Sequence, residues 1–309
     1  MRENHTDSRG IGFLLAAIFC FASVPVFLRH FTGFLDSWTV NGVRYALATC
    51  FWLPVVLRTQ GKTEAGANVW RDALVPAAIN IVMQIGWAMA PYHNTAVVIG
   101  FVIRCSFLFS TLFACLLLPV ERGVLRHRLF WVGAAGIIGG LTLMYLGSLT
   151  AGGTTLLGIS ILVGTAALWG LYGVLVRQRM ARYGAALSFG VVSLYTAVAL
   201  GGLAFAVGDW RAAAEVSCRD WGLLVVSALF GIAFSHVLLY RAIHILGPVA
   251  TEGGLAVLPF ATALAAVLFL HEKLAALQWL GGVLLVVSCA CLISTRYRKS
   301  PARNNAATS

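Results

Sequence analysis

Three adjacent residues near the end of the chain, His271, Glu272 and Lys273, combine groups that bind zinc or transfer protons. A zinc protease of the HExxH type places a second His four residues after the first, so that one helix turn presents both ligands. Ala275 stands at that place, and neither a GxSx protease stretch nor a closely spaced carboxylate pair is visible. We therefore expect no metal site, no cofactor and no enzymatic activity.

A single arginine, Arg104, lies about nine residues into the apolar run 95–119, with no acidic residue close in sequence. An arginine at that depth of a bilayer costs something like 2.5 to 3.5 kcal/mol, so it should face inward and have a partner. The guanidinium fork holds a carboxylate through two hydrogen bonds. We expect Arg104 to bind an anionic or zwitterionic solute. The alternative is permanent pairing with Glu252 or with backbone carbonyls.

Three residues of the run 72–91, Asn80, Gln84 and Trp87, are spaced four and three apart and therefore share one helical face. Polar amides facing lipid are costly, so this face should point into the protein. Hydrogen bonding between helices and contact with a solute both explain it. Under the second interpretation Asn80 and Gln84 orient the solute, while Trp87 and Trp169 form walls of its cavity.

Other polar groups in the second half of the chain have two interpretations each. His236 and Tyr240, beside Ser235, either pack inward or take part in binding and proton transfer. Glu252 lies about three residues into the run 249–270, where it is either a coupling carboxylate or a group hydrated at the membrane interface.

Two prolines, Pro25 and Pro259, lie inside apolar runs. Each removes one helical hydrogen bond and frees a backbone carbonyl, which a membrane tolerates best against protein or a water-filled cavity. The two residues are therefore candidates for gating, with a purely structural kink as the alternative.

The composition predicts the setting of these residues. Hydrophobic residues make up 60% of the 309 positions and charged residues 11%, against roughly 45 to 50% and 25% in a soluble domain. The net charge of +11 is spread over short loops, whereas a nucleic-acid binder gathers Lys and Arg on one face. We expect an all-α polytopic membrane protein in contact with the lipid bilayer, and no nucleic-acid partner.

Ten apolar runs are long enough to cross a bilayer. They lie at 10–29, 37–57, 72–91, 95–119, 129–149, 156–177, 186–207, 221–240, 249–270 and 276–295. If the N-terminus is cytoplasmic, sixteen of the 22 Lys and Arg residues fall on the inner side and four on the outer side, with Arg44 and Arg104 inside spans. This asymmetry predicts a protein of the inner (plasma) membrane with both termini in the cytoplasm.

The chain is also internally duplicated. Residues around Gly10 to Arg29 align by eye with residues around Gly158 to Arg177, and the first span is thus the counterpart of the sixth. We predict one repeat of five spans in residues 1–150 and a second in residues 151–309, which includes a cytoplasmic tail. Five is an odd number, so the two repeats have inverted topology, and such repeats place a solute site near the midplane between them.

A smooth stripe of glycines runs along the fifth span and consists of Gly133, Gly136, Gly140 and Gly147. Such stripes allow close helix packing. The alternative is a homodimer formed through the stripe.

Several of these residues resemble a known family, the drug/metabolite transporter superfamily, and specifically its ten-span members built from two EamA-type repeats. The matching residues are Trp169 and Gly170, the stretch 240–251 (YRAIHILGPVAT), Glu272 and Lys273 before 279–282, and Val43, Arg44 and Tyr45. The resemblance implies transport of small metabolites, often amino acids and their relatives outward, and a structural role for Arg44.

We therefore expect a secondary transporter, and an exporter in particular, that moves a small organic metabolite such as an amino acid or another carboxylate by alternating access. No P-loop is present, so the energy comes from a gradient or from the solute itself. The alternative is a membrane scaffold or receptor-like protein that transports nothing.

Overall fold

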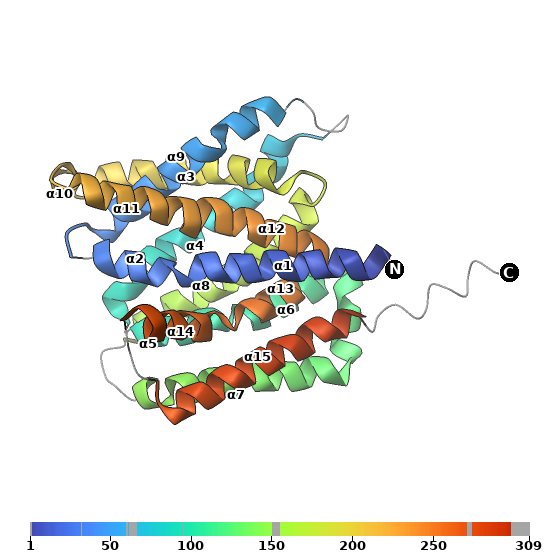
Figure 1. Cartoon of the computed structure of the whole chain (residues 1–309). Coiled ribbons are helices and arrows are strands. Elements are labelled where there is room, and N and C mark those ends of the chain that lie inside the picture. Colours follow the sequence, from blue (N-terminus) through green and yellow to red (C-terminus); the bar gives the residue numbers. More distant parts are fainter. Residues whose placement is uncertain are drawn as a thin grey trace.

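The computed structural model of the chain is entirely helical over the residues it describes, which are 2–31, 33–59, 61, 67–94, 96–149, 155–270 and 274–297 (Figure 1). The helices of the first half are α1 (Arg2–Ala22), α2 (Val24–Phe31), α3 (Ser37–Thr59), α4 (Val69–His93), α5 (Ala96–Arg104), α6 (Ser106–Leu117), η2 (Pro119–Arg126) and α7 (Arg128–Leu149). Those of the second half are α8 (Leu156–Leu175), η3 (Val176–Met180), α9 (Ala185–Val207), α10 (Trp210–Ala214), α11 (Cys218–Ala228), η4 (Leu229–Phe234), α12 (Ser235–Leu246), α13 (Pro248–Leu255), α14 (Leu258–Leu270) and α15 (Ala276–Tyr297).

The membrane-spanning character of the bundle is evident from helix length and from the outer surface. Among the described residues, eight helices are long and apolar enough to cross a bilayer, and two shorter apolar helices, Ser8–Ala22 and Pro248–Leu264, coincide with the predicted first and ninth spans. Large apolar side chains such as Phe19, Val198 and Phe205 are 74%, 71% and 80% exposed on the outside of the bundle. A surface of this kind is stable against lipid.

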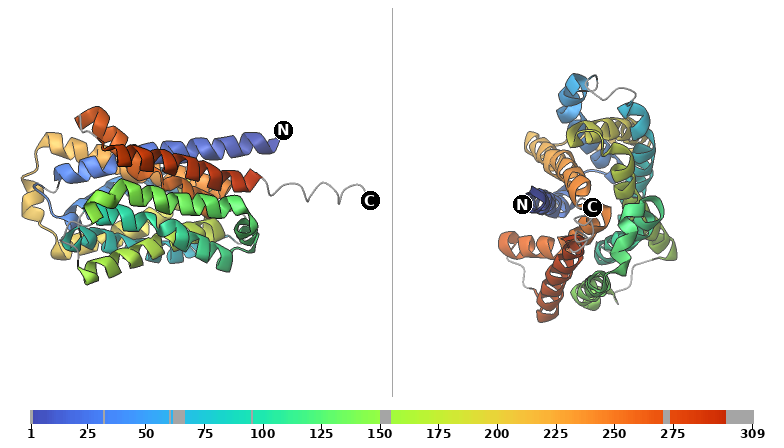
Figure 2. Two further views of the ribbon diagram at one scale, coloured as in Figure 1. Left: turned by 90° about the horizontal axis from the view of Figure 1, so that it is seen from below. Right: turned by 90° about the vertical axis from the view of Figure 1, so that its right-hand side faces the viewer.

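The packing of the helices reproduces the predicted duplication. The most extensive interfaces join α7 with α15 and α3 with α9, which are the fifth span with the tenth and the second with the seventh. The next two join α4 with α8 and α1 with α12, that is, the third span with the sixth and the first with the eighth. In a duplicated chain of five spans per repeat, the first span is the counterpart of the sixth and the third is the counterpart of the eighth. The interface of the third span with the sixth is therefore equivalent to that of the eighth span with the first. The start of α1 and the end of α15 lie at the same end of the bundle (Figure 2).

Three spans that the sequence predicted as continuous are interrupted near their middle. The first breaks at Ser23 between α1 and α2, the fourth at Cys105 between α5 and α6, and the ninth at residues 256–257 between α13 and α14. Pro25 and Pro259 are each the second residue of the helix after a break. A proline fits the first turn of a helix because the N–H groups there have no intrahelical partner. The side chain of Pro25 lies outside the described residues.

The glycine stripe of α7 is filled from within the same chain. A Cβ atom on Gly133 would lie 2.9 Å from the backbone oxygen of Ser288, and one on Gly140 would lie 2.9 Å from that of Gly281, both on α15. The packing interpretation of the stripe is therefore confirmed. A homodimer through this stripe was a wrong expectation, because α15 already occupies it.

Asp36 forms hydrogen bonds that connect two loops at the end of the bundle opposite the termini. Its Oδ1 accepts hydrogen bonds from the N–H groups of Trp38 and Thr39 (both 2.9 Å), which caps α3, and its Oδ2 accepts one from Asp209 N–H (2.9 Å) before α10. Partial burial raises the pKa of Asp36, but the hydrogen bonds from Thr39, Asp209 and Trp38 outweigh it and hold the pKa below its usual value. The ionised carboxylate thus joins two loops that are far apart in sequence.

Candidate transport site

Arg104, the last residue of α5, lies where the broken fourth and ninth spans meet. Its Nη1 donates a hydrogen bond to the backbone oxygen of Leu255, the last residue of α13, at 3.5 Å. In a continuous helix that oxygen would accept the N–H of residue 259, but residue 259 is a proline. The sequence correctly indicated a freed carbonyl, and the structure shows that a cationic side chain from the other repeat reaches it.

Glu252 lies one helical turn before Leu255 and is only 3% exposed. Ser106, the first residue of α6, donates a hydrogen bond from Oγ to Glu252 Oε2 at 3.1 Å, and the indole of Trp169 on α8 also interacts with this carboxylate. Contact with Ser106 places the carboxylate at mid-depth in the fourth span, so the interpretation of Glu252 as a group hydrated at the interface is wrong. In the described part of the chain, no nitrogen of Arg104 comes within 4.0 Å of a Glu252 oxygen.

An aromatic cluster surrounds His236 at the same level of the bundle. The His236 ring stacks on Phe189 with centroids 4.9 Å apart and meets Phe21 edge-on at 5.3 Å, while Phe21 lies 6.5 Å from Trp169. His236 Nδ1 lies 3.0 Å from the backbone oxygen of Ile232, and the ring is 3% exposed. These contacts favour the packing interpretation of His236.

Tyr240 belongs to the same cluster and is fully buried. Its hydroxyl oxygen lies 2.6 Å from that of Tyr172 on α8, so the pair joins the eighth span to the sixth within the second repeat. The hydrogen bond satisfies the polar tip of each ring, as buried tyrosines require.

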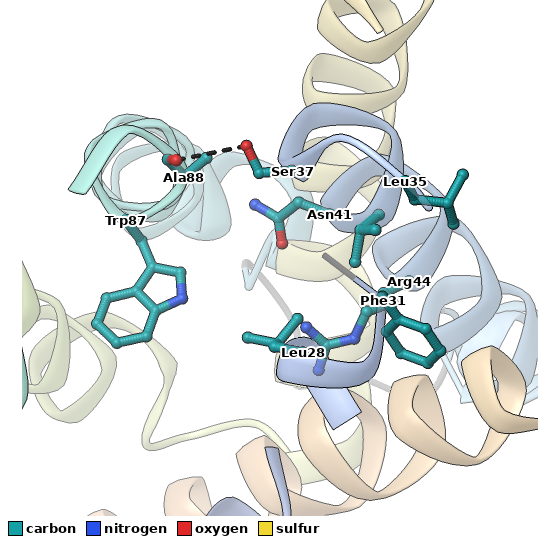
Figure 3. A pocket seen from close by; sticks show the side chains of 9 residues that line it. Leu28, Phe31, Leu35, Ser37, Asn41, Arg44, Trp87 and Ala88 are labelled. Atoms are coloured by element: carbon teal, nitrogen blue, oxygen red, sulfur yellow. Dashed lines mark hydrogen bonds between the residues drawn. The ribbon is translucent and has the colours of Figure 1, made fainter. Parts of the chain in front are cut away.

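A pocket of about 100 Å³ opens between α2, α3 and α4 (Figure 3), and α2 lies on the side of the bundle opposite the termini (Figure 1). Its apolar wall consists of Leu28, Phe31, Leu35, Val40, Trp87 and Ala88, and its polar residues are Ser37, Asn41 and Arg44. The Trp87 ring and the polar ends of Asn41 and Arg44 face the same space from opposite sides (Figure 3). Trp87 therefore lines a pocket, but this pocket does not include Arg104 or Trp169, with which Trp87 was predicted to enclose a solute.

Comparison of the chain with known proteins identifies its family. The model of the EamA-like transporter family matches this chain twice, over residues 8–146 and 156–294. The chain belongs to the EamA-like transporter family. A solved structure titled only "Crystal structure of protein" shares 16% sequence identity with this EamA-like transporter at a TM-score of 0.72, covering 95% of this chain and 99% of that one. The search of curated proteins found no match to this chain. Family membership makes the chain a multi-pass membrane transporter and not an enzyme.

In this EamA-like transporter the three candidates of the third span, Asn80, Gln84 and Trp87, do not form a single site. Asn80 Nδ2 donates to Thr196 Oγ1 on α9 at 2.9 Å and to the Tyr45 hydroxyl on α3 at 3.4 Å, and Asn80 is fully buried. Those contacts favour hydrogen bonding between helices over contact with a solute. Gln84 is 6% exposed, whereas Trp87 reaches the pocket. The polar contacts of Asn80 share no residue with those of Arg104.

The residue that sequence reasoning missed is Asn41. It lies three positions before Arg44, so both side chains leave α3 on one face, and this spacing could have indicated the pair. Arg44 itself was expected to be structural, and one of its nitrogens, Nη2, does donate to the backbone oxygen of Ser227 at 3.4 Å. The motif residues 271–273 lie outside the described residues, and within those described no group of three His, Cys, Asp or Glu is placed to hold a metal ion.

Proposed function

We propose that this EamA-like transporter is a secondary transporter that exports a small organic solute bearing a carboxylate, such as an amino acid, across the inner membrane by alternating access. Both termini face the cytoplasm in this proposal, in agreement with the distribution of Lys and Arg. The two repeats rock about the centre of the bundle and expose it to each side in turn.

The observation that carries the proposal is the crossing of the two interrupted spans. The fourth span belongs to the first half of the chain and the ninth to the second, and each breaks where it meets the other, at Arg104 and Ser106 on one side and Glu252 and Leu255 on the other. Irregular backbone at membrane depth is tolerated where it is buried in protein or lines a cavity. Transporters with inverted repeats use such broken helices at their solute sites. A scaffold needs no polar centre of this kind.

The balance of charge favours an anionic or zwitterionic solute. Among the described residues of the spans, Arg44 is buried and Arg104 is partly buried, against one buried carboxylate at mid-depth, Glu252. A surplus of buried positive charge is costly unless a partner supplies the opposite charge. A carboxylate on the solute supplies it during each transport cycle.

Arg104 and Glu252 act in this proposal as the gate between the repeats. Direct contact between Arg104 and the solute stays a prediction, and the bond from Arg104 to Leu255 favours the alternative of backbone pairing. The polar contacts join α5 and α6 to α13 in the conformation described here. We infer that they break when the repeats rock apart, and that protonation of Glu252 is one means of releasing Ser106.

Transport by purified protein in liposomes tests the proposal. Vesicles preloaded with one of a panel of amino acids and organic acids should show counterflow of the labelled solute above that of protein-free vesicles. Arg104→Lys and Arg104→Gln then separate the two roles of Arg104. If Arg104 is part of a gate, both variants should change the maximal transport rate and leave the apparent affinity for the solute unchanged. If Arg104 contacts the solute, Arg104→Lys should weaken the apparent affinity and Arg104→Gln should abolish binding. Absence of flux for every solute, from correctly folded protein, would leave the scaffold alternative.

A further inference from the structure

We propose that the pocket formed by Asn41, Arg44 and Trp87 is the binding site for the carboxylate head group of the solute. This inference rests on the proposed transport function and names the residues that hold the charged end of its substrate. The described residues of the lining include no acidic one, so a carboxylate entering the pocket meets hydrogen-bond donors and an aromatic wall.

The charge of Arg44 is the first reason. Arg44 is 4% exposed, and its hydrogen bond to the described residues is a single long one, 3.4 Å, from Nη2 to the Ser227 oxygen. Its Nε is buried with no partner among the residues the structure describes. A buried guanidinium without a carboxylate is costly, and its fork is shaped to bind a planar anion.

The position of Asn41 is the second reason. Asn41 is 9% exposed, it lines the same pocket, and its Nδ2 also has no partner in the described structure. Two residues on one face of α3 that each have an unsatisfied donor therefore line one cavity. Buried donors without partners are rare in folded proteins, and a ligand is one way to satisfy them.

The size of the cavity sets what it holds. A volume of about 100 Å³ is well below the roughly 300 Å³ at which whole small-molecule sites begin. It accommodates a carboxylate and a few carbon atoms, with the remainder of the solute outside the pocket. Arg44 is the eighth residue of α3, so it lies about 10 Å along that helix from its first residue. The site is thus on the route between the centre and the outer surface.

Arg104 provides a matched comparison within the same chain. It is also a span arginine, but its guanidinium reaches the Leu255 oxygen at the end of α13 and has Glu252 nearby. Its charge is therefore compensated from within the protein. If buried arginines bound carboxylates without regard to their surroundings, the two residues would respond alike.

Thermal unfolding of the full-length protein in detergent tests the assignment without requiring transport. The probes are propionate, phenylacetate and L-leucine, each paired at constant ionic strength with its uncharged-carboxyl analogue propionamide, phenylacetamide or L-leucinamide. We expect at least one carboxylate to raise the Tm above the value with its amide. Arg44→Gln should abolish that difference, whereas Arg104→Gln should retain it.

Asn41→Asp is the decisive variant, because it places a carboxylate beside Arg44 and should fold even if Arg44→Gln does not. We expect a higher Tm without ligand and an affinity for the effective carboxylate at least tenfold weaker than in the wild type. Asn41→Leu, which removes the amide without adding charge, should weaken binding and leave the ligand-free Tm unraised. Unchanged carboxylate binding in Asn41→Asp, or loss of binding in Arg104→Gln alone, would overturn the assignment.

Two further results also count against the pocket. Equal stabilisation by chloride and by the carboxylates would show a general anion site. Absence of stabilisation by every probe at about 50 mM would show that the pocket does not bind carboxylates. Counterflow in liposomes separates the two proposals. Flux with unchanged apparent affinity in Asn41→Asp rejects the pocket and leaves the transporter, whereas Arg44-dependent stabilisation without any flux supports the pocket and rejects transport.

Discussion

Replacing Gly170 by alanine should separate the sixth span from the fourth. A Cβ atom at Gly170 would lie 2.5 Å from the backbone nitrogen of Ser110, 2.7 Å from the backbone oxygen of Ser106 and 3.0 Å from the carbonyl carbon of Phe109. All three atoms belong to the backbone of α6 and cannot rotate away. Relief requires α8 to retreat by about 0.5 to 1 Å, and overpacking of this kind costs typically 1 to 3 kcal/mol.

The matched control lies on the same helix. A Cβ atom at Gly164 meets no atom within 4 Å, so Gly164→Ala should gain the usual helix preference of alanine, roughly 0.5 to 1 kcal/mol. The same gain offsets part of the cost at Gly170, which leaves a net loss of about 1 kcal/mol and a gap of about 2 kcal/mol between the two variants. Unfolding of both proteins by SDS in mixed micelles measures this gap. Equal stability of the two variants would refute the close contact of α8 with α6.

Three other perturbations test separate parts of the structure. Exposed Cys218 should react with an impermeant thiol reagent from outside the cell, whereas a cysteine at exposed Arg126 should not; labelling of both from one side would exclude the proposed topology. Pro259→Ala supplies the missing N–H at the break and should slow counterflow severalfold without loss of folding, whereas a normal rate would limit Pro259 to packing. Asp36→Ala removes a helix cap and should cost about 1 kcal/mol at pH 7. The folded pKa of Asp36 is lowered. The cost of the substitution should therefore persist above the unfolded pKa of about 3.9 and shrink as the pH falls through the folded pKa. A constant cost down to about pH 3 would contradict an ionised cap.

The spans and their duplication could be predicted from the sequence because burial in lipid imposes long apolar runs and because the two repeats retain related residues. The breaks at Ser23 and after Leu255 were foreseeable from the prolines that follow them. The break at Cys105 was not, since the first proline after it is Pro119, beyond the end of α6. Tertiary contacts of Arg104 and Ser106 with the ninth span accompany this break, and a single sequence does not contain their geometry.

The site was predicted only in part for a related reason. Helical spacing correctly grouped Asn80, Gln84 and Trp87 on one face, but a face some 100° wide can contact more than one neighbour. Asn80 meets α3 and α9, whereas Trp87 lies about two turns nearer the helix end and reaches the pocket. Distance along the chain was also a poor measure of depth for Glu252, because α13 starts inside the protein, with Pro248 to Leu255 all buried.

The meeting of α5 and α13 at Arg104 has a consequence for membrane voltage. A helix C-terminus carries roughly half a negative elementary charge, and Arg104 lies at the ends of both helices, one from each repeat. Rocking that parts the repeats leaves the guanidinium with one of its two compensating ends, so about half a charge becomes displaced within the electric field. At about 2.3 kcal/mol per charge per 100 mV, that amounts to about 1 kcal/mol if the whole field is crossed and proportionally less for a shorter movement. Under the proposed alternating access, the transport cycle is coupled to the membrane potential even when the solute itself carries no net charge.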